Sequence, residues 1–79
     1  MAATGGERAG FVRYQQEAAR RALQRGDLAG ARAAMKALRV ADFRSNEAAE
    51  SGLAVLRDNR SEEEDVLDAL KRLIQLEPS

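Results

Sequence analysis

The sequence contains no cysteine and no histidine. Without cysteine the chain forms neither a disulfide nor a thiolate zinc site. Histidine is the residue that most often serves as a general base and as a neutral metal ligand, so its absence removes the usual means of hydrolytic and transition-metal chemistry. Tryptophan is absent too, and the aromatic residues are Phe11, Tyr14 and Phe43. We therefore expect a chain that is not an enzyme and that uses no cofactor and no metal.

Long hydrophobic runs are also missing. The longest apolar run is only a few residues, whereas a bilayer-spanning helix needs roughly 20. Residues 1–10 lack the hydrophobic segment of a signal peptide, and residues 1–6 are small and glycine-rich, which predicts a disordered leader. We therefore expect no transmembrane segment, a cytoplasmic location and a single domain over residues 7–79.

The net charge of zero conceals a separation of charge along the chain. Residues 1–44 carry nine Arg or Lys against four Asp or Glu, and residues 45–79 carry four against nine. Each half is therefore a candidate surface for a partner of opposite charge. A chain of 79 residues buries only about 60 to 65 per cent of its unfolded surface, so assembly with a partner or with itself would add usefully to its stability.

Apolar residues recur at helical spacing in four segments, and no segment alternates with the period of two that is typical of strands. The predicted helices cover residues 7–25, 28–41, 47–57 and 62–77. Gly26 is placed to end the first helix in the left-handed conformation, and Asp27 to cap the second. Because this junction is so short, the two helices are predicted to form an antiparallel hairpin.

The second half of the chain repeats this pattern. Ser45 or Asn46 is predicted to cap the third helix, and Ser61 with Glu64 forms a capping box for the fourth, which Pro78 ends. The sequence thus predicts an all-α fold of four short helices arranged as two stacked antiparallel helical hairpins, residues 7–42 and 46–77. Leu38 and Leu70 are expected to be buried where the hairpins meet.

A shift of the sequence by 35 residues superposes the two predicted hairpins, and small residues surround the Gly-Asp turn of the first. This pattern resembles a tetratricopeptide repeat, and the residues that carry the likeness are Ala18, Ala19, Ala22, Gly26 and Ala31. The second unit ends Leu76-Glu77-Pro78, which is similar to the ending of that repeat. The resemblance implies stacked hairpins with a groove for a partner helix or peptide.

A second likeness covers residues 14–41 alone. Many arginines surround Tyr14, Ala18, Ala19, Gly26, Asp27 and Ala31, and this combination resembles the short basic helical-hairpin repeats of the lethal giant discs family. Those repeats bind acidic-helix subunits of the ESCRT-III membrane-remodelling filament. The resemblance therefore implies a protein partner of acidic character.

Basic and aromatic side chains are the candidate binding residues. Arg32, Lys36 and Arg39 recur at helical spacing on the second predicted helix, and Arg21 and Arg25 do so on the first. They form either a docking surface for an acidic helix or a solvated face with partners such as Glu17. The aromatics at the start of the first helix, Phe11 and Tyr14, either fill the core or anchor a partner. The acidic run 62–65 lacks the spacing of a calcium loop and complements the dipole of its helix.

We therefore expect a non-catalytic helical adaptor or protein–protein interaction module that binds a partner helix or peptide. One alternative is a structural subunit that self-assembles into a homo-oligomer through the apolar face of the fourth helix. The other is a basic-faced nucleic-acid accessory protein. Zero net charge and the scarcity of aromatics place nucleic acid after a protein partner.

Overall fold

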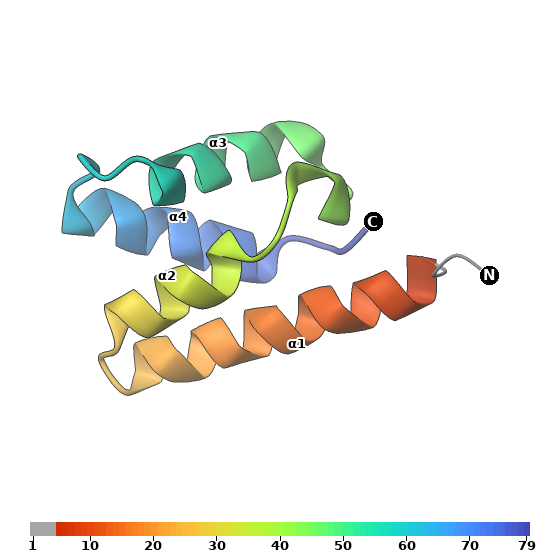
Figure 1. The fold of residues 1–79 in the computed structure, drawn as a ribbon, viewed down its shortest axis with the longest axis horizontal. Helices are drawn as coiled ribbons and strands as arrows, with labels where there is room; N and C mark the ends of the chain where they lie inside the picture. Colours follow the sequence, from red (N-terminus) through yellow and green to blue (C-terminus); the bar gives the residue numbers. More distant parts are fainter. Residues whose placement is uncertain (1–4) are drawn as a thin grey trace.

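The computed structural model describes residues 5–79 and contains four α-helices and one short 3-10 helix. In chain order these are α1 (Gly5–Gln24), α2 (Leu28–Lys36), η1 (Val40–Asp42), α3 (Asn46–Arg57) and α4 (Glu63–Gln75) (Figure 1). Of the predicted leader, residues 1–4 lie outside the described part, and α1 begins at Gly5, two residues before the predicted start of the first helix. No helix within residues 5–79 is both long and apolar enough to cross a membrane.

The helices pair as two antiparallel hairpins, α1 with α2 and α3 with α4, which confirms the predicted all-α fold. In Figure 1, α1 and α3 lie at opposite edges of the molecule, with α2 and α4 between them. Helix α4 contacts the other three helices, and α1 makes no contact with α3. The core is therefore enclosed by the inner faces of all four helices around α4.

The turn between α1 and α2 follows from two adjacent residues. Gly26 has φ of 77°, which costs glycine nothing because it has no Cβ. The amide of Asp27 donates to the carbonyl of Ala22 at 2.8 Å, and the amide of Gly26 donates to that of Leu23 at 3.0 Å, as in a Schellman motif. The Asp27 carboxylate then accepts from the amide of Gly30 at 2.8 Å and caps α2. The predicted roles of Gly26 and Asp27 are both confirmed.

Helix α2 is shorter than its sequence indicates. It was predicted to continue to Ala41 but ends at Lys36, and Ala41 is exposed. The chain is extended at Arg39, turns through η1, and carries Phe43 into the core, where it forms an isolated antiparallel bridge with Pro78. The helix stops because burial of this aromatic residue requires the chain to cross toward the second hairpin.

Asp42 fixes this connecting segment. Its carboxylate is 2 % exposed and forms a two-point ion pair with Arg8, at 2.6 Å from Nε and 2.8 Å from Nη2. It also accepts from the backbone amide of Arg39 at 2.8 Å, at the start of η1. The hydrogen bond from Arg8 holds the pKa of Asp42 below its ordinary value and outweighs the opposing effect of burial.

The starts of the last two helices agree only in part with the prediction. Ser45 caps α3, because its hydroxyl accepts from the amide of Ala48 at 3.3 Å. The predicted capping box of Ser61 and Glu64 is wrong: α4 begins at Glu63, Glu62 occupies the N-cap position, and no side chain caps the helix. Three acidic residues in its first turn stabilise that end through the helix dipole instead.

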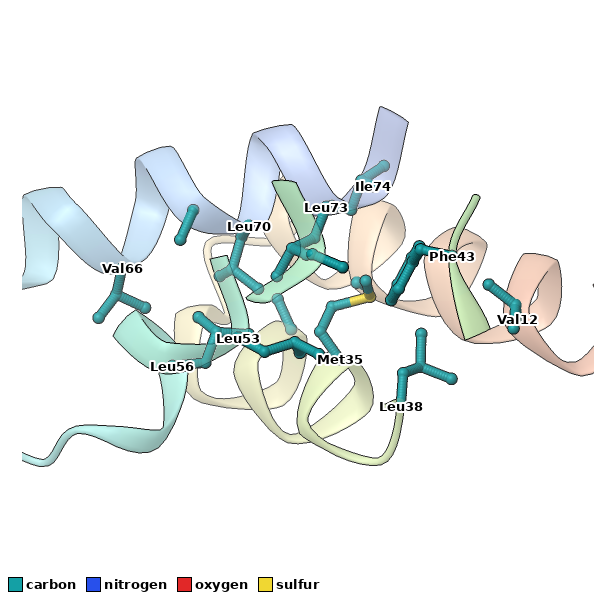
Figure 2. Packing of buried hydrophobic residues seen from close by; sticks show 14 of the residues in the cluster. Val12, Met35, Leu38, Phe43, Leu53, Leu56, Val66, Leu70, Leu73 and Ile74 are labelled. Atoms are coloured by element: carbon teal, nitrogen blue, oxygen red, sulfur yellow. The ribbon is translucent and has the colours of Figure 1, made fainter. Parts of the chain in front are cut away.

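The core consists of aliphatic side chains from all four helices together with Phe43 (Figure 2). Leu38 and Leu70 are both 0 % exposed, which confirms their predicted burial. Gly52, which weakens α3 as an isolated helix, permits the close approach of α4: a Cβ at this position would lie 2.8 Å from Cγ of Leu73. A packing requirement therefore explains this glycine.

Side chains from one hairpin cap helix ends in the other. The buried Gln16 of α1 donates to two carbonyl groups at the end of α4, those of Leu73 at 2.9 Å and Leu76 at 2.7 Å. In the opposite direction, Arg57 of α3 donates to the carbonyl of Leu38 at 3.0 Å, just beyond α2. The Leu76 carbonyl lies at the end of α4 and the Leu38 carbonyl just beyond α2, where no further helical amide follows, whereas the Leu73 carbonyl also accepts from the amide of Leu76 at 3.3 Å.

Candidate functional site

The two aromatic residues at the start of α1 lie on the surface. Phe11 is 40 % exposed and Tyr14 is 71 % exposed, so neither fills the core, and that interpretation is wrong for both. Val12, between them, is fully buried instead. The guanidinium carbon of Arg8 lies 4.7 Å from the centroid of the Phe11 ring, a cation–π contact that holds this ring in place.

The exposed aromatics lie on the same side of the first hairpin as two basic residues. Phe11, Tyr14 and Arg21 follow one another at intervals of three and seven residues, which places them on one face of α1. Arg25 is the first residue beyond α1, and its amide still donates to the carbonyl of Arg21 at 3.2 Å, so it continues that face. We call this set the α1 stripe. All four side chains are exposed, and Ala18 in the middle of the stripe is half-buried. The stripe is therefore aromatic at one end and cationic at the other.

The ion pairs along the stripe lie at the solvent-exposed surface. Arg21 lies 3.2 Å from the Glu17 carboxylate, and Arg25 lies 3.7 Å from that of Asp27. The arginine side chains are 71 % and 64 % exposed, respectively. Exposed pairs of this kind contribute about 0 to 1 kcal/mol. Both arginines can therefore turn toward an external carboxylate at small cost.

Arg32 has a structural role that the sequence analysis missed. It is half-buried, and its guanidinium donates to the carbonyl of Leu56 at 2.8 Å and to that of Asp58 at 3.2 Å. Both carbonyls stand at the C-terminal end of α3, where a cation is favourable. Arg32 is therefore a cap for α3 and is not free to bind a partner.

The predicted basic face of the second helix is consequently not formed. Lys36 is exposed at the end of α2. Arg39 lies beyond the helix in extended backbone, with its guanidinium 3.8 Å from the Asp42 carboxylate. Because α2 ends early, Arg32, Lys36 and Arg39 do not share one helical face. A hydrogen-bonding partner for Arg32 could not be recognised from spacing, since it is 24 residues away in the sequence.

One of the hollows between the two hairpins is largely polar. The hollow between α1 and α4 has a volume of about 550 Å³, and six of its eight lining residues are charged or amide residues. The apolar ones are Ile74 and Leu76. A partner helix would find little apolar surface there. The α1 stripe, with two exposed aromatic rings, is the better candidate for docking.

The apolar face of α4 is buried in the core of the chain itself. Val66 is 2 % exposed, and Leu70 and Leu73 are 0 % exposed. These side chains pack against the other three helices and are not presented to a second molecule. Within residues 5–79 no group of histidine, cysteine, aspartate or glutamate residues is arranged to hold a metal ion.

The resemblances to the tetratricopeptide repeat and to the lethal giant discs repeat stay predictions. Comparisons with protein-family models, with curated proteins and with solved structures give no significant match.

Proposed function

We propose that the protein is a non-catalytic interaction module that binds an acidic helix or peptide of a partner protein through the α1 stripe. One observation carries this proposal: Tyr14 and Phe11, the exposed large hydrophobic residues of the described chain, lie on the same helical face as the exposed Arg21 and Arg25. The nucleic-acid alternative is weaker, because base stacking would have only these two rings to use.

The chemistry of the stripe suits a protein partner. Tyrosine and arginine are among the residues that most often dominate the free energy of protein–protein binding. A partner that covers Phe11 and Tyr14 removes apolar surface from water at both positions. Arg21 and Arg25 would attract carboxylates of the partner and set its orientation, which accelerates association at low salt.

The proposal can be tested with designed peptides. The probe is an 18-residue amphipathic helix with leucines at helical spacing and glutamates elsewhere, and its controls are a lysine version and a scrambled version. Because Tyr14 is the only tyrosine and tryptophan is absent, intrinsic fluorescence reports directly on the stripe. We expect the glutamate peptide to bind, and its dissociation constant to rise at least about tenfold between 0.05 and 0.5 M salt.

Variants then locate the binding surface. Replacing Arg21 and Arg25 with glutamine should weaken binding of the fluorescently labelled peptide, whereas replacing Arg13 and Arg20 should not. The second pair removes the same charge from another face of the same helix. Equal weakening in both variants, or equal binding of the lysine peptide, would refute the proposal. Tight binding of random-sequence RNA or DNA would favour the nucleic-acid alternative.

A further inference from the structure

We propose that a second copy of this chain is a partner of the α1 stripe, received in the groove between α3 and α4. The inference rests on the function proposed for the stripe and names one of its occupants. In the resulting assembly, the stripe of each molecule lies in the groove of the next.

The groove between α3 and α4 has a volume of about 690 Å³. Its base contains two small buried residues, Gly52 and Ala69. Ala48, Gly52 and Val55 line the α3 wall at intervals of four and three residues, so the wall is one continuous helical face. A groove between two such faces is the kind of site that accepts another helix.

The rim of the groove is acidic. Glu47 of α3 and Asp65 and Asp68 of α4 line it, and all three are exposed. Within residues 5–79, the carboxylate of none of the three takes part in a hydrogen bond or an ion pair. Glu47 and Asp65 stabilise the first turns of their helices, but Asp68 lies beyond the first turn of α4 and has no such role. Arg72 is the one basic lining residue.

Stripe and groove complement each other in size and in charge. The stripe presents two bulky aromatic rings followed by two arginines, whereas the groove presents small residues at its base and carboxylates at its rim. The same opposition extends to whole halves of the chain, since residues 1–44 have an excess of five positive charges and residues 45–79 an excess of five negative charges. A second copy thus supplies both kinds of complementarity.

The geometry requires two molecules. Helices α1 and α3 lie at opposite edges of the fold and make no contact (Figure 1), so a stripe cannot enter the groove of its own chain. The contact joins two different surfaces and therefore produces an open chain or a ring. One helical face covers less than the roughly 800 Å² per partner of a standard interface, so the association should be weak and sensitive to salt.

Sedimentation velocity tests the inference on the unmodified protein. Between 0.01 and 1 mM protein in 0.05 M salt, we expect the weight-average sedimentation coefficient to rise with concentration. In 0.5 M salt it should stay at the monomer value. In the same dilution series, amide resonances of Tyr14, Gly52 and Ala69 should shift together in nuclear magnetic resonance spectra. A monomer at every concentration in low salt would overturn the inference.

Charge reversal identifies the surfaces. We expect the R21E/R25E variant to be monomeric alone, and the E47K/D68K variant likewise. An equimolar mixture of the two should associate again, because the basic stripe of the second variant fits the acidic groove of the first. Failure of the mixture to associate, with both variants folded by circular dichroism, would refute the contact. If either variant fails to fold, the amide shifts of Tyr14, Gly52 and Ala69 in the unmodified protein show whether the stripe and the groove form the contact.

A matched control uses acidic residues of α3 and α4 that do not line the groove. The E50K/E64K variant has the same change in net charge as E47K/D68K, and it should associate as the unmodified protein does. Loss of association in this control would show a general charge effect and overturn the inference. A monomeric protein whose groove binds an 18-residue basic amphipathic peptide would also overturn it, in favour of a foreign basic helix. Binding of the glutamate peptide to the stripe tests the proposed function separately.

Discussion

Arg32 offers the sharpest test of which basic residues support the fold and which are free to bind. We compare Arg32→Met with Lys36→Met, because both changes remove one positive charge from α2 and keep an unbranched apolar stem. Arg32 donates two hydrogen bonds to carbonyls at the end of α3, at 2.8 and 3.2 Å. Lys36 is exposed at the end of its own helix.

The magnitude follows from these contacts. A hydrogen bond from a charged donor contributes about 1.5 to 3 kcal/mol. A cation beside a helix C-terminus adds about 0.3 to 1 kcal/mol. The 3.2 Å bond is exposed and adds little. Arg32→Met should therefore lower the free energy of unfolding by about 2 to 3 kcal/mol, and Lys36→Met by less than about 1 kcal/mol, since it loses only a dipole interaction.

Urea denaturation followed by circular dichroism at 25 °C measures the difference. With a slope near 1 kcal/mol/M for so small a domain, the midpoint of Arg32→Met should fall by about 2 to 3 M and that of Lys36→Met by less than about 1 M. Where folded, Arg32→Met should bind the glutamate peptide as the unmodified protein does. Equal loss of stability in the two variants, or loss of binding in folded Arg32→Met, would refute the structural role given to Arg32.

Three further changes test tertiary contacts within the fold. Gln16→Leu deprives the Leu76 carbonyl at the end of α4 of its donor and leaves the Leu73 carbonyl with only the amide of Leu76 at 3.3 Å. The free energy of unfolding measured by melting should therefore fall by about 1 to 3 kcal/mol; an unchanged melting temperature would contradict the contact. Asp42→Asn weakens the pair with Arg8 and should cost about 2 kcal/mol at pH 7. Because folding lowers the pKa of Asp42, this advantage of the unmodified protein is complete above about pH 4, where the unfolded carboxyl ionises, and disappears as the pH falls through the folded pKa. Urea midpoints of the two proteins that differ equally at pH 7 and pH 2.5 would contradict that account. Gly52→Ala should destabilise the fold by about 1 to 2 kcal/mol despite its better helix propensity, because its Cβ would overlap Leu73; a higher urea midpoint would show that α3 and α4 can move apart.

Local signals in the sequence predicted the hairpin turn and the core well. Gly26 and Asp27 act through hydrogen bonds to residues within five positions of themselves, and that range is accessible to reasoning from spacing. The burial of Leu38 and Leu70 followed in the same way from helical periodicity. These predictions succeeded because the causes lie within one or two helical turns, although the equally local capping box of Ser61 and Glu64 did not form.

Features that depend on distant partners were missed. No glycine or proline follows Lys36 to mark the end of α2 in the sequence. The helix ends there because Phe43 enters the core. Arg32 was assigned to a docking surface because its partner carbonyls lie in the other hairpin. The exposure of Tyr14 was one of two interpretations that the sequence left open. The side chains of α1 that pack in the core are Val12, Ala19 and Ala22, and the two alanines could have indicated that this face of the helix is too close to its neighbours for a large ring.

The helix ends that are capped across the hairpin boundary make the two halves of the chain unequal. Gln16 and Arg32 of the first hairpin terminate α4 and α3, while Arg57 of the second bonds just beyond α2. A chain built by duplicating either hairpin would repeat the donors of that half without the carbonyls that they serve. We therefore expect added copies of one hairpin to be less stable than the native pair, and each hairpin to lose these caps when the two are separated.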